Sequence, residues 1–276
     1  MSTWHDLMKE FNQKNKEVFP NQRFLALLEK TLTKFDSIDI NNILLEVLDL
    51  IERERDIEKD LLKKTSSHHY IRASSIGYCP QSILFMLQGK KSKPSNSLLR
   101  KFHNGSFAHI RIQSYLLAMS KFFPDEIKII HLEPYFVSER YNICGHVDAI
   151  ISIDTEDYIV EFKTINHEEF QGLFEVKAEH YLQAHAYALM TGIERILLLY
   201  EDKNNQNWKC FYEQYDCEIA DTVIKPKIKT ILQAFANNET LQRYDGSSDS
   251  CKYCLYKSFC KQLTLETEES DIYDLL

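Results

Sequence analysis

The chain has 276 residues, of which 44% are hydrophobic and 27% charged, and its formal net charge is −8. This composition is typical of a globular protein of one or two domains, and the absence of an apolar run of 18 residues excludes a transmembrane helix. The first residues lack the apolar segment of a secretion signal, so we expect a cytoplasmic protein without membrane contact. Five acidic residues lie in the last eleven positions, so much of the negative net charge comes from this segment. The net charge therefore does not exclude a local basic surface elsewhere.

The first 65 residues have the periodicity of helices. Apolar residues recur at intervals of three or four positions in two stripes, the first led by Leu25 and the second by Ile40. From Glu52 the pattern becomes dense in charge, which indicates either a solvated helix face or a helix that faces a protein partner. We therefore expect residues 1–65 to form a helical region able to bind a protein partner, with a break at residues 65–67.

Two further helices are predicted before the first strand. Ser74 or Ser75 is a candidate N-cap for a helix through residues 82–88. Ser97 is a candidate N-cap for a longer helix that ends near residue 120. The polar loop between these helices contains the proline and serines that usually interrupt helical structure.

This loop and the start of the longer helix are basic. Within twelve residues they contain no acid and five cations, which are Lys90, Lys91, Lys93, Arg100 and Lys101. Such a segment fits the phosphate backbone of a nucleic acid. The aromatic residues Phe102 and Tyr115 follow, and we expect both to pack in the protein core rather than to contact a ligand.

From residue 131 the hydrophobic period changes from 3.6 to 2, which predicts strands. The predicted elements, in chain order, are strands at 131–139, 143–153 and 158–165, a helix at 175–191 that ends at Gly192, strands at 195–201 and 208–215, and a helix at 218–240. Residues 154–157 suit a hairpin turn between the second and third strands. Strands that alternate with helices predict an α/β fold class with a mixed central sheet flanked by helices.

Two acidic residues and a lysine lie on the two strands of this hairpin. Glu161 and Lys163 are two residues apart and so point to one face of the third strand, while Asp148 lies in the second strand. The carboxylates and the carbonyl of Phe162 are hard oxygen ligands for a divalent cation. Lys163 would orient or deprotonate a water and stabilise charge on a phosphate. Taken alone, the same residues also fit a cross-strand salt bridge on a solvated face.

Further motifs surround these residues in a defined order. The full set is Gly105 and His109 on a helix, Gly145 and Asp148 at the second strand, Glu161 and Lys163 in the third, and Gln183 and Tyr187 on the following helix. In order and spacing, the set resembles the motifs of the PD-(D/E)xK nuclease superfamily, specifically its RecB-like branch. Any one motif alone would fit a packed or surface residue, so the resemblance rests on the four motifs together.

The resemblance implies a restriction-endonuclease-like α/β core and a metal-dependent nuclease. The implied ligands of Mg²⁺ or Mn²⁺ are His109, Asp148 and Glu161. Lys163 is then expected to assist the attacking water, and the helix with Gln183 and Tyr187 is expected to contact the substrate. In this family the reaction is hydrolysis of phosphodiester bonds in DNA.

Seven cysteines in a chain without a secretion signal point to free thiols or metal ligands rather than disulfides. Three of them form a C-x2-C-x5-C pattern, at Cys251, Cys254 and Cys260. A closed four-cysteine site needs one more ligand, and Cys79 is the candidate. The remaining three are expected to be packed thiols, namely Cys144, Cys210 and Cys217.

One cysteine upstream of the nuclease motifs and three downstream are similar to the iron–sulfur nucleases of the RecB-like branch, which include AddB-type nuclease domains and small CRISPR-associated exonucleases. The resemblance implies an iron–sulfur subdomain whose structural [4Fe–4S] cluster ties residue 79 to residues 251–260. Zn²⁺ is the alternative occupant, although a zinc ribbon usually has two C-x2-C pairs. In the family a basic residue commonly follows the first cysteine, whereas Pro80 and Gln81 follow here.

We therefore expect a metal-dependent exonuclease that acts on single-stranded DNA ends. The alternative is a nuclease-like DNA-binding or regulatory subunit, recruited through its N-terminal helices to a helicase–nuclease or a CRISPR adaptation complex, with weak or partner-dependent cutting. Either function fits a prokaryotic protein or a viral protein in the host cytoplasm. The expected domains are a helical region at 1–65, a nuclease domain with cluster-binding flanks at 66–262, and an acidic tail at 263–276.

Overall fold

The computed structural model describes residues 20–35, 37–65, 69–241, 251 and 254–261. The first elements are helices α2 (Pro20–Phe35) and α3 (Ile40–Thr65), strand β1 (Ile71–Arg72), the 3₁₀ turn η1 (Ala73–Ser75), helices α4 (Pro80–Leu87) and α5 (Asn96–Phe122), and strands β2 (Ile127–Leu132), β3 (Tyr135–Ser138) and β4 (Ile143–His146). The later elements are strands β5 (Ala149–Ile153) and β6 (Glu156–Ile165), helices α6 (His167–Gln171) and α7 (Ala178–Thr191), strands β7 (Arg195–Asp202) and β8 (Trp208–Gln214), helix α8 (Cys217–Ile219), the π turn η2 (Ala220–Ile224) and helix α9 (Lys225–Asn237). The expectations for residues 1–19, for the break after residue 65 and for the acidic tail fall outside the described residues.

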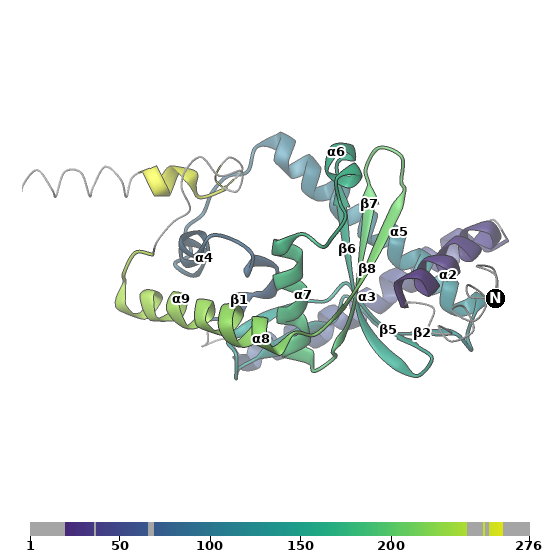
Figure 1. Ribbon diagram of the computed structural model, residues 1–276, viewed down its shortest axis with the longest axis horizontal. Helices are drawn as coiled ribbons and strands as arrows, with labels where there is room; N and C mark the ends of the chain where they lie inside the picture. Colours follow the sequence, from purple (N-terminus) through teal and green to yellow (C-terminus); the bar gives the residue numbers. More distant parts are fainter. Residues whose placement is uncertain (1–19, 36, 66–68, 242–250, 252–253, 262–276) are drawn as a thin grey trace, which may run out of the picture.

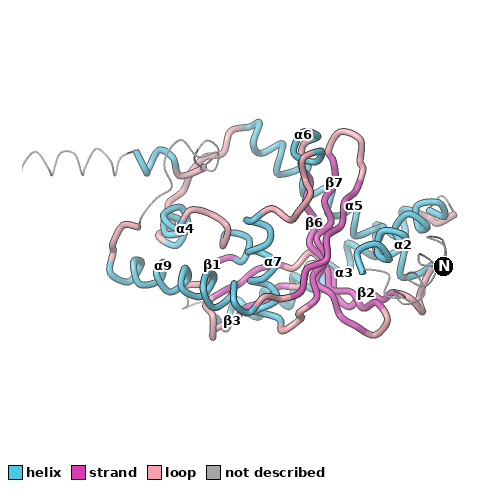
Figure 2. Tube along the Cα trace, in the orientation of Figure 1, coloured by secondary structure: helices cyan, strands magenta, loops and turns pink. Residues whose placement is uncertain are grey.

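Two sheets form the centre of the fold (Figure 2). The larger sheet has the order β2-β5-β6-β7-β8, in which β6 and β7 run parallel and the other neighbours antiparallel. The smaller sheet has the order β1-β4-β3. Helices α6 and α7 connect β6 to β7, which is the kind of crossover that a parallel pair requires. The predicted α/β class with a mixed sheet and flanking helices is confirmed.

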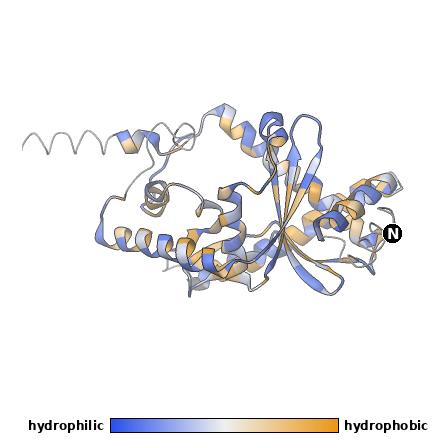
Figure 3. Ribbon diagram, in the orientation of Figure 1, coloured by the Kyte–Doolittle hydropathy of each residue, from blue (hydrophilic) through white to orange (hydrophobic). Residues whose placement is uncertain are grey.

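The alternation of side chains along β6 fills two apolar cores, one on each face of the larger sheet. Residues 158, 160 and 162 belong to the core shared with α2, α3 and α5. Residues 159 and 165 belong to the core shared with α7 and α9. Figure 1 accordingly shows α2 on one side of the sheet and α7 on the other, and in Figure 3 the middle of the sheet is hydrophobic while the hairpin ends are hydrophilic. Both faces of β6 are therefore covered, as its nearly continuous apolar sequence requires.

Helices α2 and α3 pack into the core of the larger sheet. Their buried side chains, which contact α5 and the strands, are Phe24, Leu27, Leu28, Ile43, Val47 and Ile51. The charge-dense second half of α3 is largely solvated, although Glu58 contacts His146 of β4 at 3.1 Å. Among the described residues, no helix is long and apolar enough to cross a membrane.

The first two predicted strands are each divided between the two sheets, so these predictions were wrong in part. The chain passes from β2 to β3 at residues 133–134, and from β4 to β5 at residues 147–148. At this crossing the Val147 N–H donates to the Pro134 carbonyl and the Glu133 N–H donates to the Asp148 carbonyl, both at 3.1 Å. Because apolar residues continue through the change of sheet, hydrophobic periodicity does not reveal it.

Helix ends were predicted better than helix starts. Gly192 ends α7 in the left-handed conformation, with φ of 77°, as predicted. The N-cap of helix α5 lies two residues earlier than predicted, because Ser95 rather than Ser97 accepts the capping hydrogen bond. Helix α4 begins at Pro80 without a side-chain cap, and proline suits this first position because its missing N–H would have no helical partner there. Both candidate caps, Ser74 and Ser75, lie in η1 instead.

Replacement of Leu28 by alanine is expected to lower the free energy of unfolding by about 2–5 kcal/mol, because this fully buried side chain fills the core between α2 and the sheet. The matched control is Leu45→Ala on α3, where the side chain is 64% exposed and the change should stay within about 0.5 kcal/mol. Urea denaturation followed by circular dichroism measures both values. Equally small effects would show that α2 does not fold together with the core.

Candidate functional site

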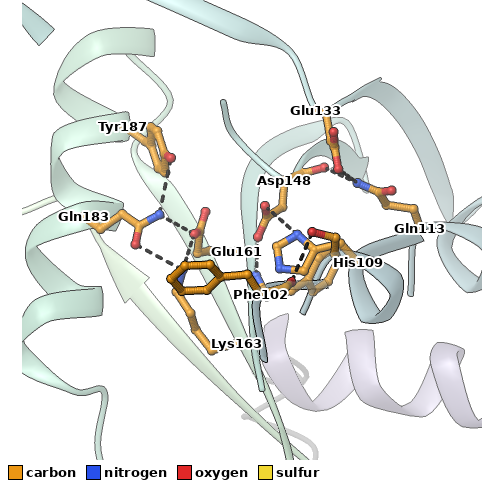
Figure 4. A network of polar contacts seen from close by, with 11 residues as sticks. Phe102, His109, Gln113, Glu133, Asp148, Glu161, Lys163, Gln183 and Tyr187 are labelled. Carbon is orange, nitrogen blue, oxygen red and sulfur yellow. Dashed lines mark hydrogen bonds and ion pairs between the residues drawn. The ribbon is translucent and has the colours of Figure 1, made fainter. Parts of the chain in front are cut away.

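Glu161 and Lys163 lie on the face of β6 that points to α7. On this face they lie between Ile159 and Ile165 of the apolar core, and Glu161 is only 1% exposed. The Lys163 Nζ donates to Glu161 Oε1 at 2.6 Å and to Gln183 Oε1 of α7 at 3.0 Å. Figure 4 shows these side chains as part of one polar network. The sequence spacing thus places a charged pair where the strand would otherwise bury aliphatic side chains.

Asp148 joins the network from the point where the chain passes from β4 to β5. Its Oδ2 accepts a hydrogen bond from the Phe162 N–H at 2.7 Å, and its Oδ1 lies 3.1 Å from Nδ1 of His109. His109 comes from α5, and its ring packs edge-on against Phe162 with a centroid distance of 6.0 Å. The structure therefore brings together the predicted histidine, aspartate, glutamate and lysine from helix α5, from the passage between β4 and β5, and from strand β6.

Gln183 and Tyr187 support this network from one face of α7. The Gln183 Nε2 donates to Glu161 Oε1 at 2.5 Å and lies 3.3 Å from the Tyr187 hydroxyl. Tyr187 is 2% exposed and its ring lies against Gly145. Both side chains are expected to contact substrate, and in this structure their polar atoms contact the network rather than solvent.

Burial and neighbouring charges shift the pKa values of the two carboxylates in opposite directions. Burial, together with the negative charge of Asp148, raises the pKa of Glu161 to about 7. Burial acts in the same sense on Asp148, but the positive charges of His109 and Lys163 hold the pKa of Asp148 below its usual value. The charge of Asp148 in turn raises the pKa of His109 to about 9. The site therefore favours positive charge beside this pair of acids.

The donor set suits a hard divalent cation. Glu161 Oε2 is buried and has no hydrogen-bond partner among the described residues. A buried carboxylate oxygen without a partner is costly, and a cation would both satisfy it and offset the repulsion from Asp148. The other ligand atoms are paired with each other, His109 with Asp148 and Glu161 with Lys163, and no complete set of three metal ligands is gathered within the described part of the chain.

The predicted cluster cysteines come from two distant parts of the sequence. Burial raises the pKa of the Cys254 thiol. The nearby Cys79 and Cys251 raise the same pKa further through their charges. The Cys254 Sγ also accepts a hydrogen bond from the Tyr256 N–H at 3.4 Å. Cys260 follows on the same short segment, where its N–H donates to the Tyr256 carbonyl. The cysteine before α4 is thus brought to the C-terminal cysteine segment.

Aromatic packing fixes this C-terminal segment on α4. The ring of Phe85 lies 5.9 Å from Tyr256 and 5.7 Å from Phe259. On the other side, Lys227 of α9 donates to the carbonyls of Ile76 and Tyr78 in the loop before Cys79. The approach of residue 79 to residue 254 is therefore supported by contacts that do not involve the thiols.

Of the three remaining cysteines, two are buried and one is exposed. Cys144 and Cys210 are buried, as predicted. Cys217 is exposed, so its prediction as a packed thiol was wrong, and the reason is its position at the start of α8 on the surface.

Gln81 is 1% exposed and its Oε1 accepts a hydrogen bond from the Leu241 N–H at 2.6 Å. It therefore joins α4 to the segment after α9.

The five cations of the basic segment are exposed and lie between the end of α4 and the first turns of α5. Lys90 is placed 5.7 Å from the ring centre of Phe259. The two aromatic residues that follow have different surroundings. Tyr115 is half-buried against Phe35 and Trp208, as predicted. Phe102 is 49% exposed, so its prediction as a core residue was wrong.

His180 is a polar residue beside the network that was not predicted. It precedes Gln183 by three residues on the same face of α7, and its Nδ1 lies 2.8 Å from the Tyr200 hydroxyl. Tyr200 pairs in register with Lys163 across β6 and β7. Burial and the positive charge of Lys163 lower the pKa of His180 to about 3, so the imidazole is neutral. The spacing from Gln183 is the sequence signal that could have found it.

A family model of the PD-(D/E)XK nuclease superfamily matches residues 85–261. This span contains the whole polar network and the three C-terminal cysteines. This chain belongs to the PD-(D/E)XK nuclease superfamily. The family predicted from the four motifs is thereby confirmed, while Cys79 and helices α2 and α3 lie outside the matched span.

Among known members of related families, the CRISPR-associated exonuclease Cas4 of Francisella tularensis subsp. novicida (strain U112) is 30% identical over 142 residues, which are 49% of this chain. This chain covers 64% of that relative, which is less than two thirds of its length. The crystal structure of SSO0001 gives a TM-score of 0.47 at 20% identity, over 73% of this chain and 92% of the other. An alkaline exonuclease from Laribacter hongkongensis gives 0.44 at 12% identity, over 62% and 89%. At these scores the structural likeness is coarse.

The two motif glycines are expected to respond oppositely to alanine. At Gly145 a Cβ would lie 3.0 Å from Cε1 of the buried Tyr187 ring, so Gly145→Ala should destabilise the fold by about 1–3 kcal/mol. At Gly105, inside α5, a Cβ would meet no atom of the described residues within 4 Å, so Gly105→Ala should stabilise the fold by about 1 kcal/mol. Urea denaturation measures both changes, and an unchanged stability of Gly145→Ala would show that Tyr187 is free to move.

Proposed function

We propose that this chain is a divalent-metal-dependent DNA exonuclease that hydrolyses phosphodiester bonds at single-stranded ends. The observation that carries the proposal is the buried pair Asp148 and Glu161 with Lys163 at its side. Such a pair is costly to a fold unless it binds a cation, and hard oxygen donors suit Mg²⁺ or Mn²⁺. Membership of a nuclease superfamily supports the same reaction class.

The residues that would hold the metal ion are His109, Asp148, Glu161 and the carbonyl of Phe162. When bound, a divalent cation supplies Lewis-acid activation of the phosphate. The unpartnered Glu161 Oε2 supports a ligand at this position. The backbone N–H of Phe162 fixes one Asp148 oxygen, which leaves the orientation of this carboxylate set before any ligand arrives.

Lys163 would act on the phosphate and its attacking water. An ammonium group has three hydrogens, and Glu161 and Gln183 each take one. The third is available for a phosphate oxygen or a water, where its positive charge would stabilise the extra negative charge of the transition state. Gln183 and Tyr187 would then hold Glu161 and Lys163 in place, so that their contribution to substrate binding is through these two residues.

We further propose that Cys79, Cys251, Cys254 and Cys260 hold a structural [4Fe–4S] cluster, with Zn²⁺ as the alternative. Two observations support a common thiolate site: Cys79 and Cys251 act electrostatically on Cys254, and the Cys254 Sγ accepts an N–H···S hydrogen bond.

DNA is the proposed partner, and the exposed cations between α4 and α5 would contact its backbone. A cytoplasmic location fits a nuclease that acts on intracellular DNA.

A second function, recruitment to a larger helicase–nuclease or CRISPR adaptation complex, is supported by α3. Although one side of α3 packs in the core, the rest of its surface exposes the apolar side chains of Leu45 (64%), Leu48 (48%) and Ile57 (53%). Exposed apolar side chains along one helix are typical of a protein contact. The name of the Cas4 relative, which is CRISPR-associated, fits the same proposal. The domain boundaries at residues 65 and 262 stay predictions.

The first test is cleavage of end-labelled linear single-stranded DNA by the anaerobically purified protein with Mn²⁺. Lys163→Ala is expected to lower the rate by about 10²–10³-fold, because one preorganised positive donor at the transition state is lost. Lys128→Ala, at an exposed position of β2, is the control and should cut normally. A closed circular substrate that stays intact would identify an exonuclease. Equal rates for the two variants, or no cutting by the unaltered protein alone, would contradict the proposal and favour the recruited subunit.

The second test concerns the cysteines. The anaerobically purified protein is expected to contain about four iron atoms per chain, and Cys254→Ala should lose them together with the visible absorption of the cluster. Cys217→Ala, which changes an exposed thiol outside the site, should keep both. Elemental analysis distinguishes the occupants, since about one zinc per chain would support the alternative. A protein with neither metal would rule out a four-cysteine metal site.

A further inference from the structure

The first half of α5 projects from the fold. None of residues 96–111 is buried, and the helix enters the core only from Ile112 onward. In Figure 1 this half of the helix runs along the top of the view, to the left of the upper end of the sheet. A helix of 27 residues thus combines a buried half with a solvated half, and His109 lies near the border between them.

One face of this helix leads directly into the polar network. Phe102, His109 and Gln113 recur at positions i, i+7 and i+11, so they lie in one stripe. Gln113 is buried, His109 contacts Asp148, and Phe102 lies two turns further out, about 10 Å along the axis. Figure 4 draws Phe102 together with the residues of this network. An exposed aromatic ring therefore lies on the face of α5 that carries His109, two turns from this proposed metal ligand.

The helix surface between this ring and His109 carries a residue without a side chain. Gly105 lies between them on the helix, and a Cβ built there meets no described atom within 4 Å. Glycine is less favourable than alanine inside a helix, and no neighbour in the described part of the chain requires it at this position. The space over Gly105 is thus available to a ligand that runs along α5 from Phe102 to His109.

The charge around the ring identifies the chemistry of that ligand. No acidic residue occurs between Asp60 and Asp125, and Arg100 and Lys101 precede Phe102 directly. Both cations are exposed, as is the ring itself. An exposed aromatic side chain on a helical segment that carries cations and no acid is suited to a polyanion whose planar groups are accessible, which describes an unpaired nucleotide strand.

We propose that Phe102 stacks on an unpaired base of a DNA strand whose backbone passes over Gly105 to the site at His109. This proposal rests on the proposed nuclease function and adds the residue that selects single strands. A duplex covers both faces of each base with its neighbours, so only an unpaired strand can offer a face to Phe102. Because every base has such a face, the selection is for single strands and not for a sequence.

The test measures binding of fluorescent oligothymidylate without added divalent metal, so that no strand is cut. Phe102→Ala is expected to weaken binding by about 5- to 150-fold, the range found for loss of one stacked base. Phe102→Trp should keep wild-type affinity. Phe107→Ala is the matched control, because Phe107 is 71% exposed on the opposite side of the same helix and should have no effect. Circular dichroism confirms that the variants are folded.

A single abasic site moved along the oligonucleotide separates stacking from other roles. In the unaltered protein one position should lose as much affinity as Phe102→Ala, and in Phe102→Ala the same abasic site should cost nothing more. Binding of Phe102→Ala within twofold of wild type, or an abasic penalty that is the same in both proteins, would overturn the proposal. Cleavage with Mn²⁺ is measured in parallel. If the unaltered protein cuts while Phe102→Ala binds normally, only this inference fails. If the unaltered protein neither binds nor cuts, the nuclease proposal fails as well.

Discussion

The burial of Asp148 and Glu161 next to each other is the constraint on which the candidate site depends. Two negative charges in a poorly solvated place repel each other, and removal of a single countercharge from such a group costs several kcal/mol. In this structure the opposing charge comes from His109 on one side and Lys163 on the other. Gln183 satisfies Glu161 without adding charge, and one oxygen of Glu161 has no partner among the described residues. The protein thus supplies most, but not all, of what this pair requires, and the remainder matches a cation.

The position of Asp148 follows from the way the chain changes sheets. If β4 and β5 formed one continuous strand, the backbone of β6 would be paired along its whole length by β5. Because β5 begins only at Ala149, the N–H of Phe162 is free to donate to the Asp148 side chain. Gln113 of α5 secures the crossing from the other side, since its Nε2 contacts the Asp148 carbonyl at 3.4 Å and Glu133 at 3.0 Å. The same crossing that misled strand prediction therefore creates the carboxylate position.

Local spacing predicted those parts of the site that depend on a single element. Glu161 and Lys163 share a face because strands have a period of two, and Gln183 and Tyr187 share one because helices have a period near 3.6. Long-range relations were not predictable in this way. The pairing of Tyr200 with Lys163, which brings His180 to the network, depends on sheet register, and the exposure of Phe102 depends on where α5 leaves the core. An apolar residue in a helical stripe is usually buried, so its sequence gives no sign that the helix has left the fold.

The thiol site and the carboxylate site are connected by one continuous segment. Cys79 precedes α4, the end of α4 leads into the basic loop, and this loop leads into the exposed half of α5, whose inner end carries His109. Contacts of Phe85 with Tyr256 and of Lys227 with the loop before Cys79 fix the beginning of this segment on the C-terminal part of the chain. The other end is fixed by His109 and Gln113 at the sheet crossing. If the four thiolates hold the proposed cluster, its loss would first release the end of this segment that begins at Cys79. The basic and aromatic residues between the two sites would then become mobile before the carboxylate network is disturbed.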